Sequence, residues 1–177
     1  TMRLSWLITK LLTPMLQYVP SHLKNSLELI NQLRNSDHNK IEFGYPCSYD
    51  VVALYTSIPI QESIDNVITK MSENNIHHFG VLTSEDIKEL LETILHSTYF
   101  RFEGVTYKQI SGLPMGCSLS GILAILFMDS IEKSALQTFG GVTIFRRYVD
   151  DCYALVRNRE EAEHLLAILN SQHQDIK

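Results

Sequence analysis

Two adjacent acids stand between two apolar, β-prone runs near the end of this 177-residue chain. The first run covers residues 145–149 and the second covers residues 152–156, with Asp150 and Asp151 between them. This pattern predicts a β-hairpin whose tip carries both carboxylates. Because side chains alternate along an extended strand, a turn is the natural way to keep the two carboxylates near one point.

The paired acids have two interpretations. Asp is common in turns, so a solvated Asp-Asp turn is the simpler one. The other is a divalent cation site, because carboxylate oxygens are the ligands that hard cations prefer. The hairpin alone does not decide between them, and two further segments bear on the choice.

The first of these segments is an apolar run at residues 47–58, which we predict to be a strand that Pro59 ends. It contains one acid, Asp50. A buried carboxylate without a partner is costly, so Asp50 should be paired, lie at the strand end or bind a metal. A capping or edge Asp is the simpler alternative.

The second segment is a glycine-rich turn at residues 112–116 that opens a long apolar helix, predicted at 118–136 and stopped by Gly140-Gly141. Backbone N–H groups at such a helix start suit an anion or a nucleic-acid backbone. A tight loop that packs a buried helix is the alternative.

The rest of the chain shows periodic apolar patterns. They predict helices at 4–18, split or kinked at Pro14, and at 21–33, 60–71, 83–96 and 160–169. Residues 99–110 predict a hairpin that turns at Glu103-Gly104, and 73–79 a polar connection. Helices that alternate with antiparallel hairpins indicate a sheet with helices on one face.

Composition excludes some classes of protein. The net charge of −5 argues against a generally basic protein that coats nucleic acid, although it leaves room for a local basic groove. No run approaches the roughly 20 apolar residues that a membrane span needs, and no secretory leader opens the chain. The three scattered cysteines suit a reducing compartment.

The three segments occur in the order of the catalytic motifs of a reverse transcriptase palm domain, which this chain resembles. Asp50 stands in the first motif, residues 112–120 match the second, and Tyr148-Val149-Asp150-Asp151 matches the third. The runs Asp50–Pro59, Gly-Leu-Pro-Met-Gly-Cys-Ser and Arg147–Asp151 are most similar to Penelope-like retroelement reverse transcriptases.

The resemblance implies an α+β fold: a polymerase palm-like antiparallel sheet with helices packed on one face, plus N-terminal helices from part of the fingers. Residues 1–42 would be the fingers-associated helical part. Residues 43–177 would be the palm with partial fingers, truncated before the thumb.

The resemblance also implies the chemistry, which is RNA-directed DNA synthesis with two Mg²⁺ ions, for which Mn²⁺ could substitute. Asp50 and Asp150 would bridge the ions, Asp151 would complete the acidic cluster, and the Val51 carbonyl would be a further ligand. On their own residues, Arg146 and Arg147 could meet phosphates or lie at a solvated strand end.

The family's substrate contacts map onto residues in each motif. Tyr55 would lie under the sugar and exclude a 2′-hydroxyl, although a core aromatic is the alternative. Pro114, Met115 and Gly116 would contact the substrate, and Tyr148 would pack near the primer end.

The implied partners are an RNA template, a DNA primer and a deoxynucleoside triphosphate, in an intracellular and, by resemblance, nuclear setting. Basic fingers residues should lie upstream and a thumb downstream, so we expect this piece alone to be inactive and to self-associate through apolar surface. A catalytically inactive, domesticated fragment that binds nucleic acid or protein is the rival interpretation.

Overall fold

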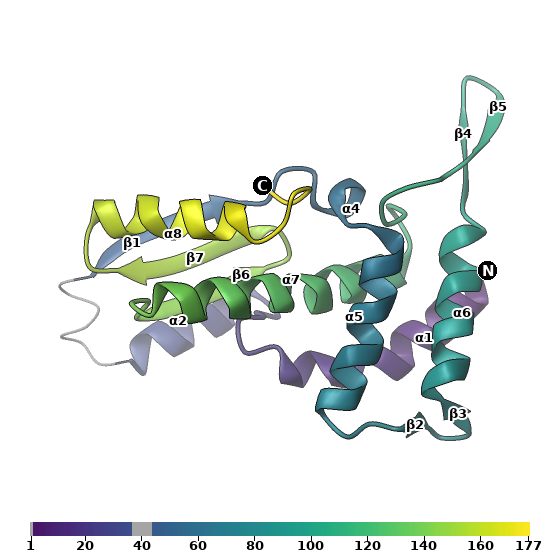
Figure 1. Ribbon diagram of the computed structural model, residues 1–177, viewed down its shortest axis with the longest axis horizontal. Coiled ribbons are helices and arrows are strands. Elements are labelled where there is room, and N and C mark those ends of the chain that lie inside the picture. The colour runs from purple at the N-terminus through teal and green to yellow at the C-terminus, as the bar shows by residue number, and fades with distance from the viewer. Residues whose placement is uncertain (1, 37–43) are drawn as a thin grey trace. The chain divides into compact units, whose positions relative to one another are not determined.

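The computed structural model describes residues 2–36 and 44–177 (Figure 1). The chain forms two compact units. Unit 1 comprises Thr1–Val19 and Ala53–Met128, and unit 2 comprises Pro20–Val52 and Asp129–Lys177. The predicted division between residues 42 and 43 lies outside the described residues and stays a prediction. Among the described helices, none is long and apolar enough to cross a bilayer.

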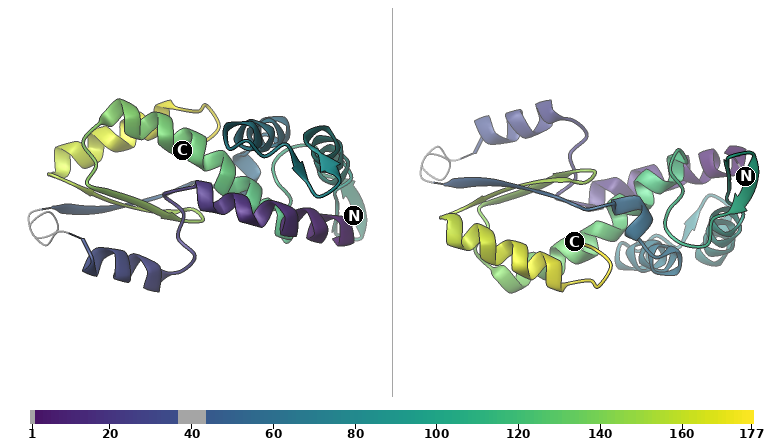
Figure 2. Two further views of the ribbon diagram at one scale, coloured as in Figure 1. Left: turned by 90° about the horizontal axis from the view of Figure 1, so that it is seen from below. Right: turned by 90° about the horizontal axis from the view of Figure 1, so that it is seen from above.

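Unit 2 contains a three-stranded antiparallel sheet in the order β1-β7-β6. The strands are β1 (Tyr45–Asp50), β6 (Ile144–Tyr148) and β7 (Asp151–Val156). Helix α8 (Arg159–Ser171) and the second half of α7 (Ser118–Phe139) lie along one face, and α2 (Ser26–Arg34) lies on the other (Figure 2). None of the nine residues of α2 is buried, so the packed helices cover one face. The predicted α+β fold is confirmed.

The start of α2 corrects the prediction of a helix from Ser21. Residues 21–23 instead run beside β6, where Arg147 N donates to Ser21 O at 2.7 Å and Leu23 N donates to Arg147 O at 2.8 Å. These backbone groups are therefore engaged by a strand and cannot make helical bonds. The helix begins only after Asn25, whose side chain accepts from Glu28 N.

The predicted strand at 47–58 is also wrong in its second half. Strand β1 ends at Asp50, which pairs with Asp151, the first residue of β7. Beyond this point β1 has no partner strand within the described sheet, and β-prone residues alone do not hold an extended chain. The chain turns through Ala53, at φ +51°, into the short helix α4 (Leu54–Ser57).

Unit 1 is mainly helical and confirms several predicted boundaries. The helix α1 (Met2–Leu12) ends next to the 3-10 helix η1 (Thr13–Tyr18), whose first turn contains Pro14. A capping box between Thr83 and Asp86 opens α6 (Ser84–His96). The other elements are α5 (Ile60–Glu73), the first half of α7, and a small hairpin of β2 (His78–Phe79) and β3 (Leu82–Thr83), whose first strand falls in the predicted polar connection.

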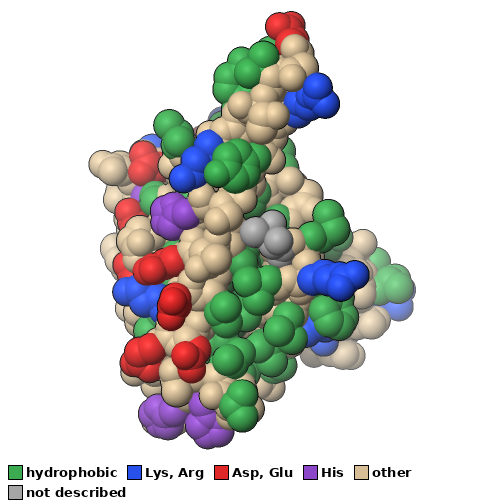
Figure 3. All heavy atoms as spheres, turned by 90° about the vertical axis from the view of Figure 1, so that its right-hand side faces the viewer, with side chains coloured by type: hydrophobic (Ala, Val, Ile, Leu, Met, Phe, Trp, Pro, Cys, Tyr) green, Lys and Arg blue, Asp and Glu red, His purple; other side chains and the backbone are tan. Residues whose placement is uncertain are grey.

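The predicted hairpin of β4 (Tyr99–Phe102) and β5 (Val105–Lys108) is confirmed. It extends from the end of α6 (Figure 1). All residues of both strands are exposed, including Phe100, Phe102 and Tyr107. Figure 3 shows hydrophobic side chains on this ribbon, with an acid at its tip.

Candidate active site

Three acids meet at one end of the unit 2 sheet. Asp50 is the last residue of β1 and lies directly opposite Asp151, the first residue of β7. Asp150 precedes Asp151 in the turn, and its carbonyl accepts a hydrogen bond from Val51 N at 3.1 Å. Antiparallel pairing thus brings together Asp50 and Asp151, which are 101 positions apart in the chain (151 minus 50).

This arrangement places like charges face to face. Asp50 and Asp151 are both exposed, and like charges directly opposite each other destabilise a sheet. In residues 2–36 and 44–177, no group of three or more His, Cys, Asp or Glu side chains is arranged to hold a metal ion. Mg²⁺ does not require one, because it is commonly held by one or two carboxylates together with substrate phosphates. Asp50 and Asp151 supply two exposed carboxylates of this kind at one end of the sheet.

The turn that carries Asp150 has an unusual backbone. Val149 has φ +57°, a conformation that is a genuine outlier for a β-branched residue. Arg147 Nη1 donates to the Val149 carbonyl at 2.9 Å. A side chain of β6 therefore holds the turn that carries Asp150.

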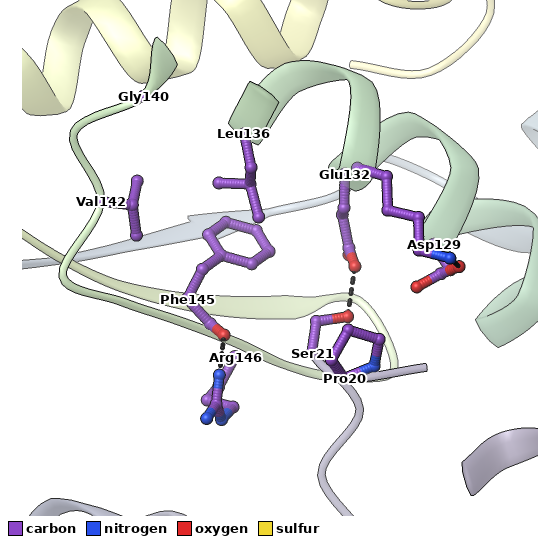
Figure 4. Close-up of a pocket in the computed structure, with 10 residues that line it drawn as sticks. Pro20, Ser21, Asp129, Glu132, Leu136, Gly140, Val142, Phe145 and Arg146 are labelled. Atoms are coloured by element: carbon purple, nitrogen blue, oxygen red, sulfur yellow. Dashed lines mark hydrogen bonds and ion pairs between the residues drawn. The ribbon is translucent and has the colours of Figure 1, made fainter. Parts of the chain in front are cut away.

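Arg147 itself corrects the prediction that it meets phosphates or lies at a solvated strand end. Its side chain is 0% exposed, and its Nε donates to a carboxylate oxygen of Glu132, which is itself buried. The Ser21 hydroxyl donates to the other oxygen of Glu132 (Figure 4). Burial raises the pKa of Glu132, and the Arg147 guanidinium acts in the opposite direction.

Glu132 and Ser21 were not predicted from the sequence. An available signal was the acid itself, because Asp129 and Glu132 interrupt an otherwise apolar helix and should have partners there. In the structure both acids line a pocket of about 320 Å³, together with Pro20, Phe145 and Arg146 (Figure 4). Asp129 forms an ion pair with Lys133 at 3.0 Å.

Tyr148 lies at the edge of the acidic end. It pairs with Asp151 across β6 and β7, and its side chain is 49% exposed. An exposed aromatic beside carboxylates is available to a bound ligand.

The remaining predicted residues lie in unit 1. Tyr55 is half-buried on α4, and its carbonyl accepts from Leu113 N at 2.6 Å. Gly112 has φ +73°, and a Cβ there would lie 2.8 Å from the Thr56 backbone. This close approach requires glycine, and it fixes the predicted substrate loop against the turn that carries Tyr55.

The rest of that loop forms the entry to α7. Pro114 is buried, and its carbonyl accepts from Ser120 Oγ at 2.6 Å. Met115 is 72% exposed, and Gly116, at φ +80°, is also exposed. Together with Trp6 and other neighbours they line a pocket of about 380 Å³. Pro114 is therefore anchored to the start of α7, and the loop presents Met115 to solvent.

Comparison with known proteins identifies one protein family. The reverse transcriptase (RNA-dependent DNA polymerase) family model matches residues 4–177. No curated protein matches the chain.

Solved structures share the fold. Apo telomerase from Candida tropicalis aligns with a TM-score of 0.74 at 13% identity, over 92% of this chain and 33% of that chain. The same enzyme truncated from its C-terminal domain gives 0.70 at 20% identity, over 91% and 36%. Telomerase from Candida albicans with a TWJ fragment of telomeric RNA gives 0.65 at 13% identity, over 94% and 31%. This chain thus spans about a third of each of these structures.

Proposed function

Because the chain belongs to the reverse transcriptase family, we propose that it forms the nucleotide-transfer part of an RNA-directed DNA polymerase. The observation that carries this proposal is the pairing of Asp50 with Asp151 beside Asp150 at one sheet end. Like charges opposite each other destabilise a sheet, and a bound cation would neutralise the exposed Asp50 and Asp151 and the half-buried Asp150.

The acidic end would hold the metal. Asp50 and Asp150 would bridge two Mg²⁺ ions, or Mn²⁺ in their place, with Asp151 and the Val51 carbonyl as further donors. When bound, such ions activate the primer 3′-hydroxyl and stabilise the leaving pyrophosphate. The sheet positions these oxygens, because Asp50 ends β1 and Asp151 begins β7.

The proposed partners are an RNA template, a DNA primer and a deoxynucleoside triphosphate. Tyr148 would pack near the primer end, and Tyr55, Pro114, Met115 and Gly116 would contact the incoming nucleotide and the template. The exposure of Tyr148 and Met115 supports these contacts. The motif runs support a Penelope-like retroelement origin within the family. By that resemblance the protein would act in the nucleus. Exposed apolar side chains, such as Phe100 and Phe102, would allow self-association.

Primer extension on an RNA template tests the proposal. In the parent protein, Asp150→Asn removes a metal-binding carboxylate and nearly preserves shape. We expect DNA synthesis to fall by orders of magnitude, since charge neutralisation supplies much of the catalysis in such sites. Glu103→Gln, which neutralises the acid at the tip of the β4–β5 hairpin, is the matched control and should keep normal synthesis. Undiminished synthesis by the Asp150 variant would contradict the assigned role.

The same assay on residues 1–177 tests the expected inactivity of this piece. Positioning of the reactants lowers the activation barrier by roughly 7–11 kcal/mol in well-oriented systems. Contacts with the substrates outside the palm would provide much of that positioning. We therefore expect no robust extension. Extension that disappears with Asp150→Asn would show that these residues suffice.

The role of Tyr55 has its own test. Tyr55→Val in the parent enzyme should raise the kcat/KM for ribonucleotides relative to deoxyribonucleotides, because it relieves a clash with the 2′-hydroxyl. Tyr18→Val replaces another tyrosine, outside the motifs, and serves as the control. An unchanged ratio for the Tyr55 variant would make Tyr55 only a packing residue.

A further inference from the structure

We propose that Arg147 is a positioning residue, which with Glu132 forms a buried clamp that fixes the turn carrying Asp150 and Asp151. This inference deepens the proposed function and rests on it for the role of the acids. The geometry of the clamp itself does not depend on that role.

The clamp connects three parts of unit 2. The Arg147 guanidinium reaches Glu132 of α7 through Nε and the Val149 carbonyl through Nη1, at 2.9 Å. Glu132 also accepts from the hydroxyl of Ser21. The Arg147 backbone bonds to Ser21 and Leu23 on its outer side. The Arg147 side chain thus connects the turn to α7, and its backbone connects β6 to the flanking segment.

The turn has a physical need for such a tie. Val149 directly precedes Asp150 and adopts a positive φ that β-branched residues disfavour, so the surroundings must hold it there. The Arg147 bond falls on the carbonyl of that same residue. A guanidinium can bond two partners in a fixed fork, which an ammonium cannot do in the same way. The direction in which the peptide before Asp150 points is therefore set by Arg147.

The alternative is that the pair only stabilises the fold. Buried ion pairs are poor stabilisers, because replacing both members by apolar residues of similar volume is often neutral or favourable. Removal of one member alone is strongly destabilising, since it leaves a buried charge without its partner. The double replacement Arg147→Met with Glu132→Met can therefore separate folding from positioning.

The first measurements use residues 1–177. For the double variant we expect a urea midpoint close to that of the wild type, faster amide exchange at Val149, Asp150 and Asp151, and Mn²⁺ affinity lower by about tenfold, the usual cost of losing a group that orients metal ligands. Arg159→Met with Glu163→Met is the matched control. That pair lies on α8 at 2.8 Å with both side chains exposed, and its loss should change none of these readouts.

Arg147→Lys is the second variant, in case the double variant does not fold. It keeps the charge beside Glu132 and loses the fork that reaches Val149. We expect it to fold, to exchange faster at Val149 and to bind Mn²⁺ more weakly. In the parent enzyme, both variants should lower kcat with little change in the KM for primer-template.

Two results would overturn the clamp. One is a folded double variant with wild-type exchange and Mn²⁺ affinity, which would make the pair a packing feature. The other is a lysine variant indistinguishable from the wild type. Failure of the proposed function would look different, because wild-type protein would then bind no Mn²⁺ at Asp50 and Asp150 while exchange at Val149 still responded to loss of Arg147.

Discussion

The two hairpins β4–β5 and β6–β7 follow the same local plan in different surroundings. Each is antiparallel, and each turn contains a residue with positive φ, Glu103 at +47° in one and Val149 at +57° in the other. Glu103 is followed by glycine, which suits such a turn, whereas Val149 is followed by Asp150. Local sequence thus favours the backbone conformation of the first turn and disfavours the positive φ of Val149 in the second.

The surrounding structure supports the second hairpin better than the first. Both strands of β4–β5 are exposed along their whole length, and a two-stranded ribbon is at best marginally stable in water. In the other hairpin, β7 pairs with β1 and Arg147 holds the turn. Asp150 and Asp151 therefore lie on the hairpin that the rest of its unit supports, where a strained turn can be kept in place.

The largest expected difference between the hairpins lies in their aromatic side chains. Phe145 on β6 is 4% exposed and Phe100 on β4 is 52% exposed. Phe145→Ala should lower the free energy of unfolding by about 3–5 kcal/mol, as for other buried aromatics. Phe100→Ala loses mainly its stacking on Tyr107 and should cost about 1 kcal/mol. Urea unfolding of both variants measures this, and equal losses would show that β4–β5 is packed in solution.

The features that were predicted correctly from the sequence depend on residues close to each other in the chain. The helical periods, the Thr83 capping box, the Pro14 break and the turn at Glu103-Gly104 are all local patterns. The acidic tip at Asp150 was predictable for the same reason.

Features that depend on distant partners were missed. Arg147 was expected near solvent or phosphate, because no residue near it in the sequence indicates that it pairs with Glu132 or that Ser21 bonds to Glu132. The strand predicted through residue 58 stops at Asp50, because β7 begins opposite that residue. The helix predicted from Ser21 starts late, because β6 takes its backbone groups. Tyr55 consequently lies on a helical turn.

Gly104 and Gly112 both have a positive φ, and we expect their replacement to change stability by an intermediate amount. Gly104 closes the β4–β5 turn with open space around it, whereas Gly112 lies against the Thr56 backbone. Gly112→Ala adds a clash to an unfavourable backbone and should cost about 2–4 kcal/mol. Gly104→Ala meets the backbone penalty alone, about 1–2 kcal/mol, and only within the ribbon.

Urea unfolding and amide exchange distinguish these outcomes. Gly112→Ala should shift the unfolding midpoint. Gly104→Ala should speed exchange in β4 and β5 and leave the midpoint nearly unchanged. A global shift from Gly104→Ala would mean that the ribbon unfolds together with the rest of its unit.

The smallest expected effect is a pH dependence at the flank of β6. His22 lies in the segment beside Arg147, and its Nδ1 is buried without a hydrogen-bond partner among the described atoms. Burial, and then the positive charge of Arg147, lower the pKa of His22 below its ordinary 6.5. Below pH 6.5 the unfolded chain therefore takes up a proton that the folded chain resists, and stability falls as the pH drops toward the lower folded pKa.

His22→Gln removes this titration while keeping a polar side chain. The wild type should lose stability relative to this variant between pH 7 and pH 5, measured as the difference between their urea midpoints at each pH. Amide exchange in β4 and β5, corrected for intrinsic rates, should not follow that difference, because His22 belongs to the flank of the other hairpin. A constant difference between the midpoints across this range would show that His22 titrates alike in the folded and unfolded chains. The strand beside Arg147 would then be open enough to hydrate a charged imidazole.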